Sequence, residues 1–322
     1  MASLDPNCAR SLSDAAGKLN AYNVVLIQHE FGIFGRADGQ AVIALLEQLT
    51  SQTIVTLHTV PTSPTMRQRH ILNRIGELAD AVIVMSNAAR RVLDRSYAIS
   101  SEILYVVPHG AHCYVSDDSE RSDIRRVILT WGLLGPGKGI EWGIEALAQL
   151  RDLDPQPVYR VVGQTHPNVL RRDGERYREH LMVIAERYDV TGMLEMRSEY
   201  LDHQSLERVV GSADIVLLPY DSRDQATSGV LIDAVAAGKP IVATRFPHAS
   251  DLLSTGAGRL VPHQNATAIA DALRTLLCEP ALYDAAATQA RSLAKTLSWT
   301  SVAERYEGLA ATLYADRTPR VA

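Results

Sequence analysis

A glycine-rich segment, GLLGPGKG, runs from Gly132 to Gly139 between a predicted strand and a predicted helix. Glycines let backbone N–H groups approach an anion, and the start of the following helix adds a favourable dipole. Lys138 supplies a full positive charge. These groups together suit a diphosphate, while a tight turn without a ligand is the simpler alternative.

The spacing of Gly132, Gly137 and Lys138 also matches most of a Walker A loop, so a P-loop phosphotransferase is a second alternative. Gly139 stands where that motif needs a hydroxyl for Mg²⁺. The neighbouring strands contain no obvious carboxylate of the Walker B kind. Both observations favour a diphosphate loop of another kind.

A second segment, DQATSGVLIDAVAAGKP, begins at Asp224. Thr227 or Ser228 is a suitable helix N-cap, and Gly229 permits close backbone approach. We expect the N–H groups at 228–230 to point out of the sheet edge at an anion. Asp233 lies about 7.5 Å beyond Ser228 along a helix. This distance is comparable to that from the phosphate to the ribose hydroxyls of a nucleotide. An ordinary capped helix with a solvent-facing carboxylate is the alternative.

Three histidines, His29, His58 and His109, each lie at or just after the carboxyl end of a predicted strand. Strand-end histidines are often structural, and three unrelated loops give no metal-ligand spacing. The functional alternative is hydrogen bonding to a sugar or diphosphate. Glu30 could orient an acceptor hydroxyl or act as a base, or be a surface carboxylate.

Six arginines form two helical groups that could share one face. A solvated, acid-balanced face and a docking patch for anionic lipid are the two interpretations. The six are Arg67, Arg69, Arg74, Arg90, Arg91 and Arg95.

Short β-branched runs alternate with helical patterns, which is typical of βαβ units and parallel sheets. The first series predicts strands at 23–28, 53–58, 81–86 and 102–107, and helices near 39–50, 66–79 and 87–96. The polar segment 111–124 is predicted to be a linker. The second series predicts strands at 127–132, 158–163, 193–198, 214–220, 240–245 and 258–261, and helices near 139–150, 175–188, 203–211, 228–237 and 266–277. Ligands of such sheets bind outside the carboxyl ends of the strands.

Length and composition favour two α/β domains: the chain has 322 residues, 46% of them hydrophobic, and a net charge of -5. The interspersed charges argue against nucleic-acid binding. Three scattered cysteines, the lack of a long apolar run and the polar start predict a cytoplasmic protein without structural disulfides. The predicted domains are 1–118 and 119–304, with a tail at 305–322 that packs back on the first.

Several motifs together resemble the family-four retaining glycosyltransferases of bacteria. They are HEFGIFG, TLHT, VPHG, GLLGPGKGIE, Gly163 and the segment DIVLLPY to PIVAT, in the family's order from about residue 22 to about 280. The resemblance implies a GT-B fold, in which two Rossmann-like domains with parallel sheets face a cleft. It also implies further strands before the HEFG segment, so the first domain looks truncated at its amino end.

The resemblance implies a role for each motif. Lys138 would hold the diphosphate, with Gly132, Gly137 and Gly163 in the donor site. Thr227, Ser228 and Gly229 would contact the distal phosphate through their N–H groups, and Asp233 would hold the ribose. His58 would reach the transferred sugar, while His29, Glu30 and His109 would lie on the acceptor side.

Two residues depart from the family pattern. The paired glutamates of the family appear as Gln225 and Asp233, with Gln225 still able to bind sugar hydroxyls. Leu133 replaces a basic residue that many members carry, so Lys138 bears more of the leaving-group charge.

The expected reaction is transfer of a hexose, mannose or glucose, from a GDP- or UDP-sugar with retention, without a metal or cofactor. A glycan, polysaccharide or lipid-linked molecule would be the acceptor, with peripheral contact to anionic membrane at the inner face. A catalytically silent sugar-nucleotide-binding module is the alternative from another class.

Overall fold

The computed structural model describes residues 4–111 and 125–315, and these form two compact units. Described residues up to His109 and from Thr300 onward make the first unit, and those from Gly110 to Trp299 make the second. Residues 112–124 of the predicted linker 111–124, the boundary at 118 and the end of the tail from 316 lie outside the described residues.

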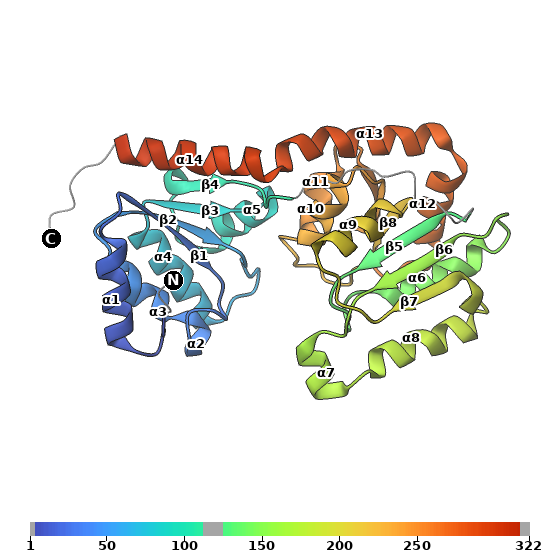
Figure 1. Ribbon diagram of the computed structural model, residues 1–322, viewed down its shortest axis with the longest axis horizontal. Helices are drawn as coiled ribbons and strands as arrows, with labels where there is room; N and C mark the ends of the chain where they lie inside the picture. Colours follow the sequence, from blue (N-terminus) through green and yellow to red (C-terminus); the bar gives the residue numbers. More distant parts are fainter. Residues whose placement is uncertain (1–3, 112–124, 316–322) are drawn as a thin grey trace. The chain divides into compact units, whose positions relative to one another are not determined.

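The first unit is a four-stranded parallel sheet in the order β1-β2-β3-β4 (Figure 1). Its strands are β1 (Val24–His29), β2 (Gln52–Leu57), β3 (Ala81–Val84) and β4 (Leu104–Val106). Its helices are α1 (Ala9–Leu19), α2 (Arg36–Gly39), α3 (Ala41–Leu46), α4 (Met66–Leu78), α5 (Asn87–Ser96) and α14 (Trp299–Ala315). Val302 and Leu309 of α14 pack on the sheet with Ile54 and Ile83, and Tyr306 Oη lies 2.9 Å from Thr56 Oγ1.

Two features of the first unit differ from the sequence prediction. The helix expected near 39–50 is the shorter α3, and it starts only after Ala37, Asp38 and Gly39, which adopt left-handed φ angles of 61°, 58° and 78°. Such angles interrupt a right-handed helix. Helix α1 was not predicted, since only Leu12 and Ala16 of its face are buried.

The second unit is a six-stranded parallel sheet in the order β10-β9-β8-β5-β6-β7. Its strands are β5 (Val127–Trp131), β6 (Val158–Val162), β7 (Leu194–Arg197), β8 (Ile215–Leu218), β9 (Ile241–Thr244) and β10 (Gly258–Val261). Its helices are α6 (Ile140–Leu147), α7 (Pro167–Asp173), α8 (Arg176–Arg187), α9 (His203–Gly211), α10 (Gly229–Ala236), α11 (Pro247–Leu253), α12 (Ala266–Cys278) and α13 (Pro280–Leu297).

Helices cover both faces of the second sheet. Buried side chains of α6, α8 and α12 form one core with one face, and those of α10, α11 and α13 form another core with the opposite face. The strand order reverses between β5 and β8, whose following loops therefore diverge. In doubly wound sheets this reversal leaves a crevice for a ligand at the carboxyl ends.

A buried carboxylate joins the two strands at this reversal. Asp214 precedes β8 and accepts hydrogen bonds from Val127 N at 2.8 Å and from Arg126 Nη1 at 2.7 Å. Its own N–H donates to Val127 O at 2.8 Å. The Asp214 side chain is only 4% exposed, so both oxygens depend on these partners.

We predict that Asp214→Ala lowers the free energy of unfolding by about 1–3 kcal/mol, because it leaves the buried N–H of Val127 without its side-chain acceptor. Urea unfolding measures this change. The exposed Glu186→Ala on α8 is the control, with an expected change within about 0.5 kcal/mol. Equal stabilities of the two variants would contradict the assigned role of Asp214.

Candidate functional site

The glycine-rich loop of the second unit follows β5 and leaves the sheet at the strand-order reversal. Gly132, Gly137 and Gly139 have φ angles of 114°, 91° and 64°, which side-chain-bearing residues rarely adopt. A Cβ at Gly139 would lie 1.9 Å from Pro219 O, so only glycine fits against the loop after β8. Asp221 N donates to Gly137 O at 2.9 Å and ties these two loops together.

Gly163, after β6, likewise allows close backbone contact, on the other side of β5 from β8. Its φ is 145°, and a Cβ there would lie 1.9 Å from Gly132 O. Beyond this contact Leu134 N donates to Gln164 O at 2.8 Å, and His166 N donates back to Leu134 O at 2.8 Å. The loops after β5 and β6 thus continue the sheet hydrogen bonding past the strand ends.

Lys138 is the charged group that this loop holds in place. Its Nζ lies 4.5 Å from the centroid of the Tyr220 ring, a cation–π contact. Burial lowers the pKa of Lys138. Among residues 4–111 and 125–315 no acid pairs with its ammonium group. A partly buried ammonium without an anionic partner is costly unless a ligand supplies one.

Helix α10 begins beside this lysine and its glycine loop. Ser228 is the N-cap, and its Oγ accepts from Leu231 N at 3.3 Å. Val230 Cγ2 would lie 3.6 Å from a Cβ at Gly132, which shows that the two predicted anion-binding junctions are neighbours. A Cβ at Gly229 would meet nothing within 4 Å, so the helix start faces open space.

The backbone N–H groups at this helix start are not all available. Ser228 N donates to Nδ1 of the buried His248 at 2.9 Å, which corrects the prediction that the Ser228 N–H is open to an anion. Within the described chain, Gly229 N–H and Val230 N–H have no acceptor. First-turn amides of this kind, with the helix dipole, favour an anion.

The remaining predicted residues of the second unit lie around α10. Thr227 precedes the cap, and Gln225 lies in the loop before it, where its carbonyl accepts from His248 N at 3.2 Å. Asp233 lies further along α10 and is half-buried. His248 and Tyr220 were missed from the sequence, although His248 lies in the first turn of α11, close after the end of β9.

The first unit gathers its predicted polar residues at the carboxyl edge of its sheet. His29 ends β1, His58 follows β2 and His109 follows β4. His58 Nε2 donates to Gln28 Oε1 at 2.7 Å, and Glu30 Oε2 accepts from Thr59 Oγ1 at 2.6 Å. Desolvation lowers the pKa of His58, with Glu30 opposing and His109 adding to the change. The four predicted residues therefore form one electrostatically coupled cluster.

His29 is the most unusual member of this cluster. Its side chain is fully buried, and neither ring nitrogen has a hydrogen-bond partner among the described residues. The ring stacks on Phe34 at 6.1 Å and meets Phe31 edge-on at 5.1 Å. Desolvation lowers its pKa to about 4, so the imidazole is neutral at neutral pH.

The arginines on the helices of the first unit contact neighbouring residues of that unit. Arg69 donates to Ser96 O, Arg74 pairs with Glu47 and Glu77, and Arg90 donates to Leu104 O. These contacts favour a solvated, acid-balanced face over a lipid-docking patch.

Within the described ranges, no three His, Cys, Asp or Glu residues form a metal-binding group. No helix there has the length and apolar character to cross a membrane.

The architecture of two parallel α/β sheets is that of the GT-B class. Sucrose-phosphate synthase from Thermosynechococcus elongatus superposes with a TM-score of 0.77 at 21% identity, covering 97% of this chain and 79% of that one. The Anabaena protein HepE, solved in complex with UDP, gives 0.80 at 16% identity, covering 94% and 82%. At these identities the likeness establishes the fold alone.

Residues 125–279 match the family model described as glycosyl transferases group 1, so this part of the chain belongs to that family. A D-inositol 3-phosphate glycosyltransferase of Corynebacterium glutamicum is 31% identical over 247 residues, which are 72% of this chain. The alpha-D-kanosaminyltransferase of Streptomyces kanamyceticus is 25% identical over 259 residues, which are 76%. The chain spans 57% and 62% of the lengths of these two relatives.

We predict that the buried His29 makes the protein acid-sensitive. Its pKa is about 4 when folded against 6.5 for an exposed histidine, so the unfolded chain binds more protons between these values. Stability should fall as the pH drops from about 6.5 to about 4, by up to about 3 kcal/mol.

Urea unfolding at neutral pH and at about pH 4.5 tests this prediction by comparing the wild type with His29→Gln. The variant should lose less stability on acidification, since its side chain does not titrate. His70→Gln, at an exposed position of α4, is the matched control and should behave like the wild type. Parallel acid profiles for the wild type and His29→Gln would contradict the linkage.

Proposed function

We propose that this protein transfers a hexose from a nucleotide-diphosphate sugar to a hydroxyl acceptor, with retention of anomeric configuration. The observation that carries the proposal is the second unit's junction of the glycine loop with α10. There, among the residues that the structure describes, no acid pairs with Lys138 and no acceptor faces the Gly229 and Val230 amides. A pyrophosphate group would supply the missing negative charge to both.

The chemistry of this junction matches departure of a nucleoside diphosphate. Negative charge develops on the leaving phosphate as its bond to the sugar breaks. Lys138 and the amide donors of α10 are fixed in advance by the glycine contacts and the Ser228–His248 bond. Preorganised donors of this kind stabilise developing charge without reorganisation cost. Asp233 is proposed to bind the ribose and Gln225 the transferred sugar.

The first unit is proposed to supply the groups that act on the sugar and acceptor. His58 holds a proton on Nε2 through its bond to Gln28, and Glu30 is oriented by Thr59. The neutral His29 and nearby His109 extend this polar edge. We propose that His58, whose Nδ1 is left as an acceptor, accepts a hydrogen bond from a hydroxyl of the transferred sugar. The leaving phosphate is proposed to accept the proton of the acceptor hydroxyl.

UDP is the first candidate for the donor base. The Anabaena protein HepE, a structural neighbour, was solved with UDP and with UDP-glucose, and TM-scores of 0.80 and 0.75 relate its fold to this chain. The acceptor is proposed to carry several hydroxyls, as a glycan, polysaccharide or glycolipid does, because the relatives are glycosyltransferases.

A thermal-shift panel tests donor recognition with UDP, GDP, ADP and their sugars, with and without EDTA. A ligand at about one hundred times its Kd stabilises the native state by about 2.7 kcal/mol. We expect UDP or UDP-glucose to give the largest shift, and EDTA to leave it unchanged. A shift only with ATP and Mg²⁺ would instead establish the P-loop alternative.

We predict that Lys138→Ala lowers sugar transfer by about 10²–10³-fold, because it removes the only full positive charge of this loop. The fold should remain intact, since a partly desolvated lysine adds little stability. Lys295→Ala, exposed on α13, is the control and should keep wild-type turnover.

Release of UDP from UDP-glucose, followed with and without a glycan acceptor, measures this effect. Unchanged turnover in Lys138→Ala would refute the assigned diphosphate site. Donor binding without any turnover in the wild type would instead identify a silent sugar-nucleotide-binding module.

A further inference from the structure

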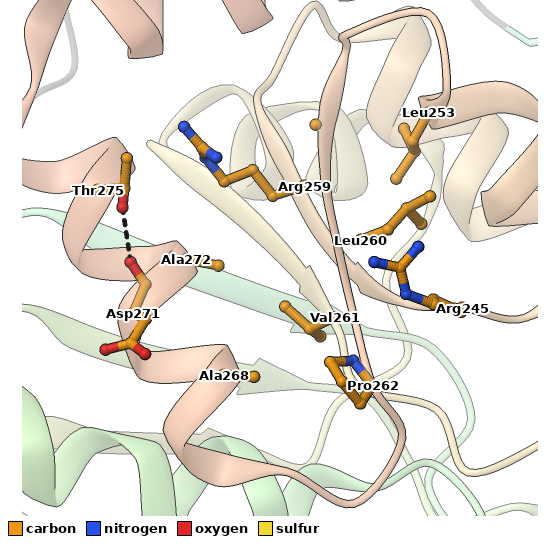
Figure 2. A pocket seen from close by; sticks show the side chains of 11 residues that line it. Arg245, Leu253, Arg259, Leu260, Val261, Pro262, Ala268, Asp271, Ala272 and Thr275 are labelled. Carbon is orange, nitrogen blue, oxygen red and sulfur yellow. Dashed lines mark hydrogen bonds between the residues drawn. The ribbon is translucent and has the colours of Figure 1, made fainter.

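A groove of about 480 Å³ follows the outer edge of the second sheet. Its lining comes from β10, α12, the end of α11 and the residue after β9 (Figure 2). It shares no lining residue with the glycine loop or the start of α10. The groove is therefore separate from the diphosphate junction.

The backbone of β10 is open along this groove. β10 is the terminal strand of its sheet and pairs with β9 alone. Val261 O accepts from Arg245 N at 3.1 Å, on the β9 side. Because N–H and C=O groups alternate along a strand, those of Leu260 point to the outer edge. An open edge of this kind can pair with another extended chain.

Side chains flank the strand on both sides. In Figure 2, Arg259 extends toward α12, where Ala268 and Ala272 leave room, while Leu260 and Arg245 lie on the other side of β10. A compact ion could reach only one of these sides. An extended peptide presents alternate side chains to opposite sides and fits the geometry of both.

The two arginines give the groove its charge preference. Arg259 is half-buried, and its Nε is buried without a hydrogen-bond partner. Neither Arg245 nor Arg259 forms a side-chain ion pair with any residue that the structure describes. The acid of the lining, Asp271, is exposed on α12. Guanidinium groups bind carboxylates through paired N–H donors, so carboxylates complete this site.

We propose that the open edge of β10 binds an extended acidic segment of a partner polypeptide. The segment adds to the sheet through the backbone of Leu260. Its carboxylates bind Arg259 on the α12 side and Arg245 on the opposite side. This surface makes the second unit a docking module as well as a nucleotide-binding one.

Fluorescence anisotropy with labelled hexaglutamate tests the proposal on the full chain, with hexaglutamine and hexalysine as matched probes. Hexaglutamate should bind, and the Arg245→Ala/Arg259→Ala double variant should weaken that binding by about tenfold or more. Arg305→Ala, exposed on α14, should leave it unchanged. Circular dichroism confirms that each variant is folded.

Charge reversal provides a second, independent test. The Arg245→Glu/Arg259→Glu variant should lose hexaglutamate binding and gain binding of hexalysine. Equal affinity for hexaglutamate and hexaglutamine, no binding of hexaglutamate, or unchanged binding in the double variants would overturn the proposal. Displacement of the peptide by an equal concentration of inorganic phosphate or free glutamate would also overturn it, since that result describes a small-anion site.

Discussion

Close approach of backbone to backbone at the strand-order reversal is the constraint on which the second unit depends. Gly139 lies against Pro219 O and Gly163 against Gly132 O at distances that exclude any Cβ. These contacts bring the loops after β5, β6 and β8 together beyond the sheet. Lys138 can then rest on the Tyr220 ring, and the start of α10 can lie beside Gly132. The glycines thus determine where charge is placed.

The buried polar side chains of the two units have different surroundings. In the second unit, Lys138 and the Gly229 and Val230 amides of α10 form the proposed site for an anion. In the first unit, burial keeps His29 neutral, while Gln28 and Thr59 fix the orientations of His58 and Glu30. The proposed site of the second unit would bind charge, whereas the first unit holds neutral imidazoles and one carboxylate in set positions. That division suits a reaction in which a charged group leaves an uncharged sugar.

Much of this arrangement could be predicted from the sequence, because strands and glycines leave strong local patterns. The VILTWG and VYRVVG runs predict β5 and β6 to within one residue, and GLLGPGKG indicates the loop that carries Lys138. The β-branched runs of the first unit likewise place its three histidines at one edge. Contacts between distant residues leave no such pattern. The bond from Ser228 N to His248, the Tyr220 ring beneath Lys138 and the left-handed turn at Ala37 depend on tertiary structure.

The departures from the family pattern acquire a physical meaning in this structure. Leu133, where many members carry a cation, is 42% exposed and contributes no charge to the loop. Lys138 is then the one basic residue in the segment 132–139. Its partial burial would strengthen its interaction with an anion, because less water screens the charge. Fixing Ser228 through His248 adds rigidity where a second cation is lacking. A site with fewer charges can compensate through lower dielectric and better preorganisation; here the burial of Lys138 provides the first and the glycine contacts the second.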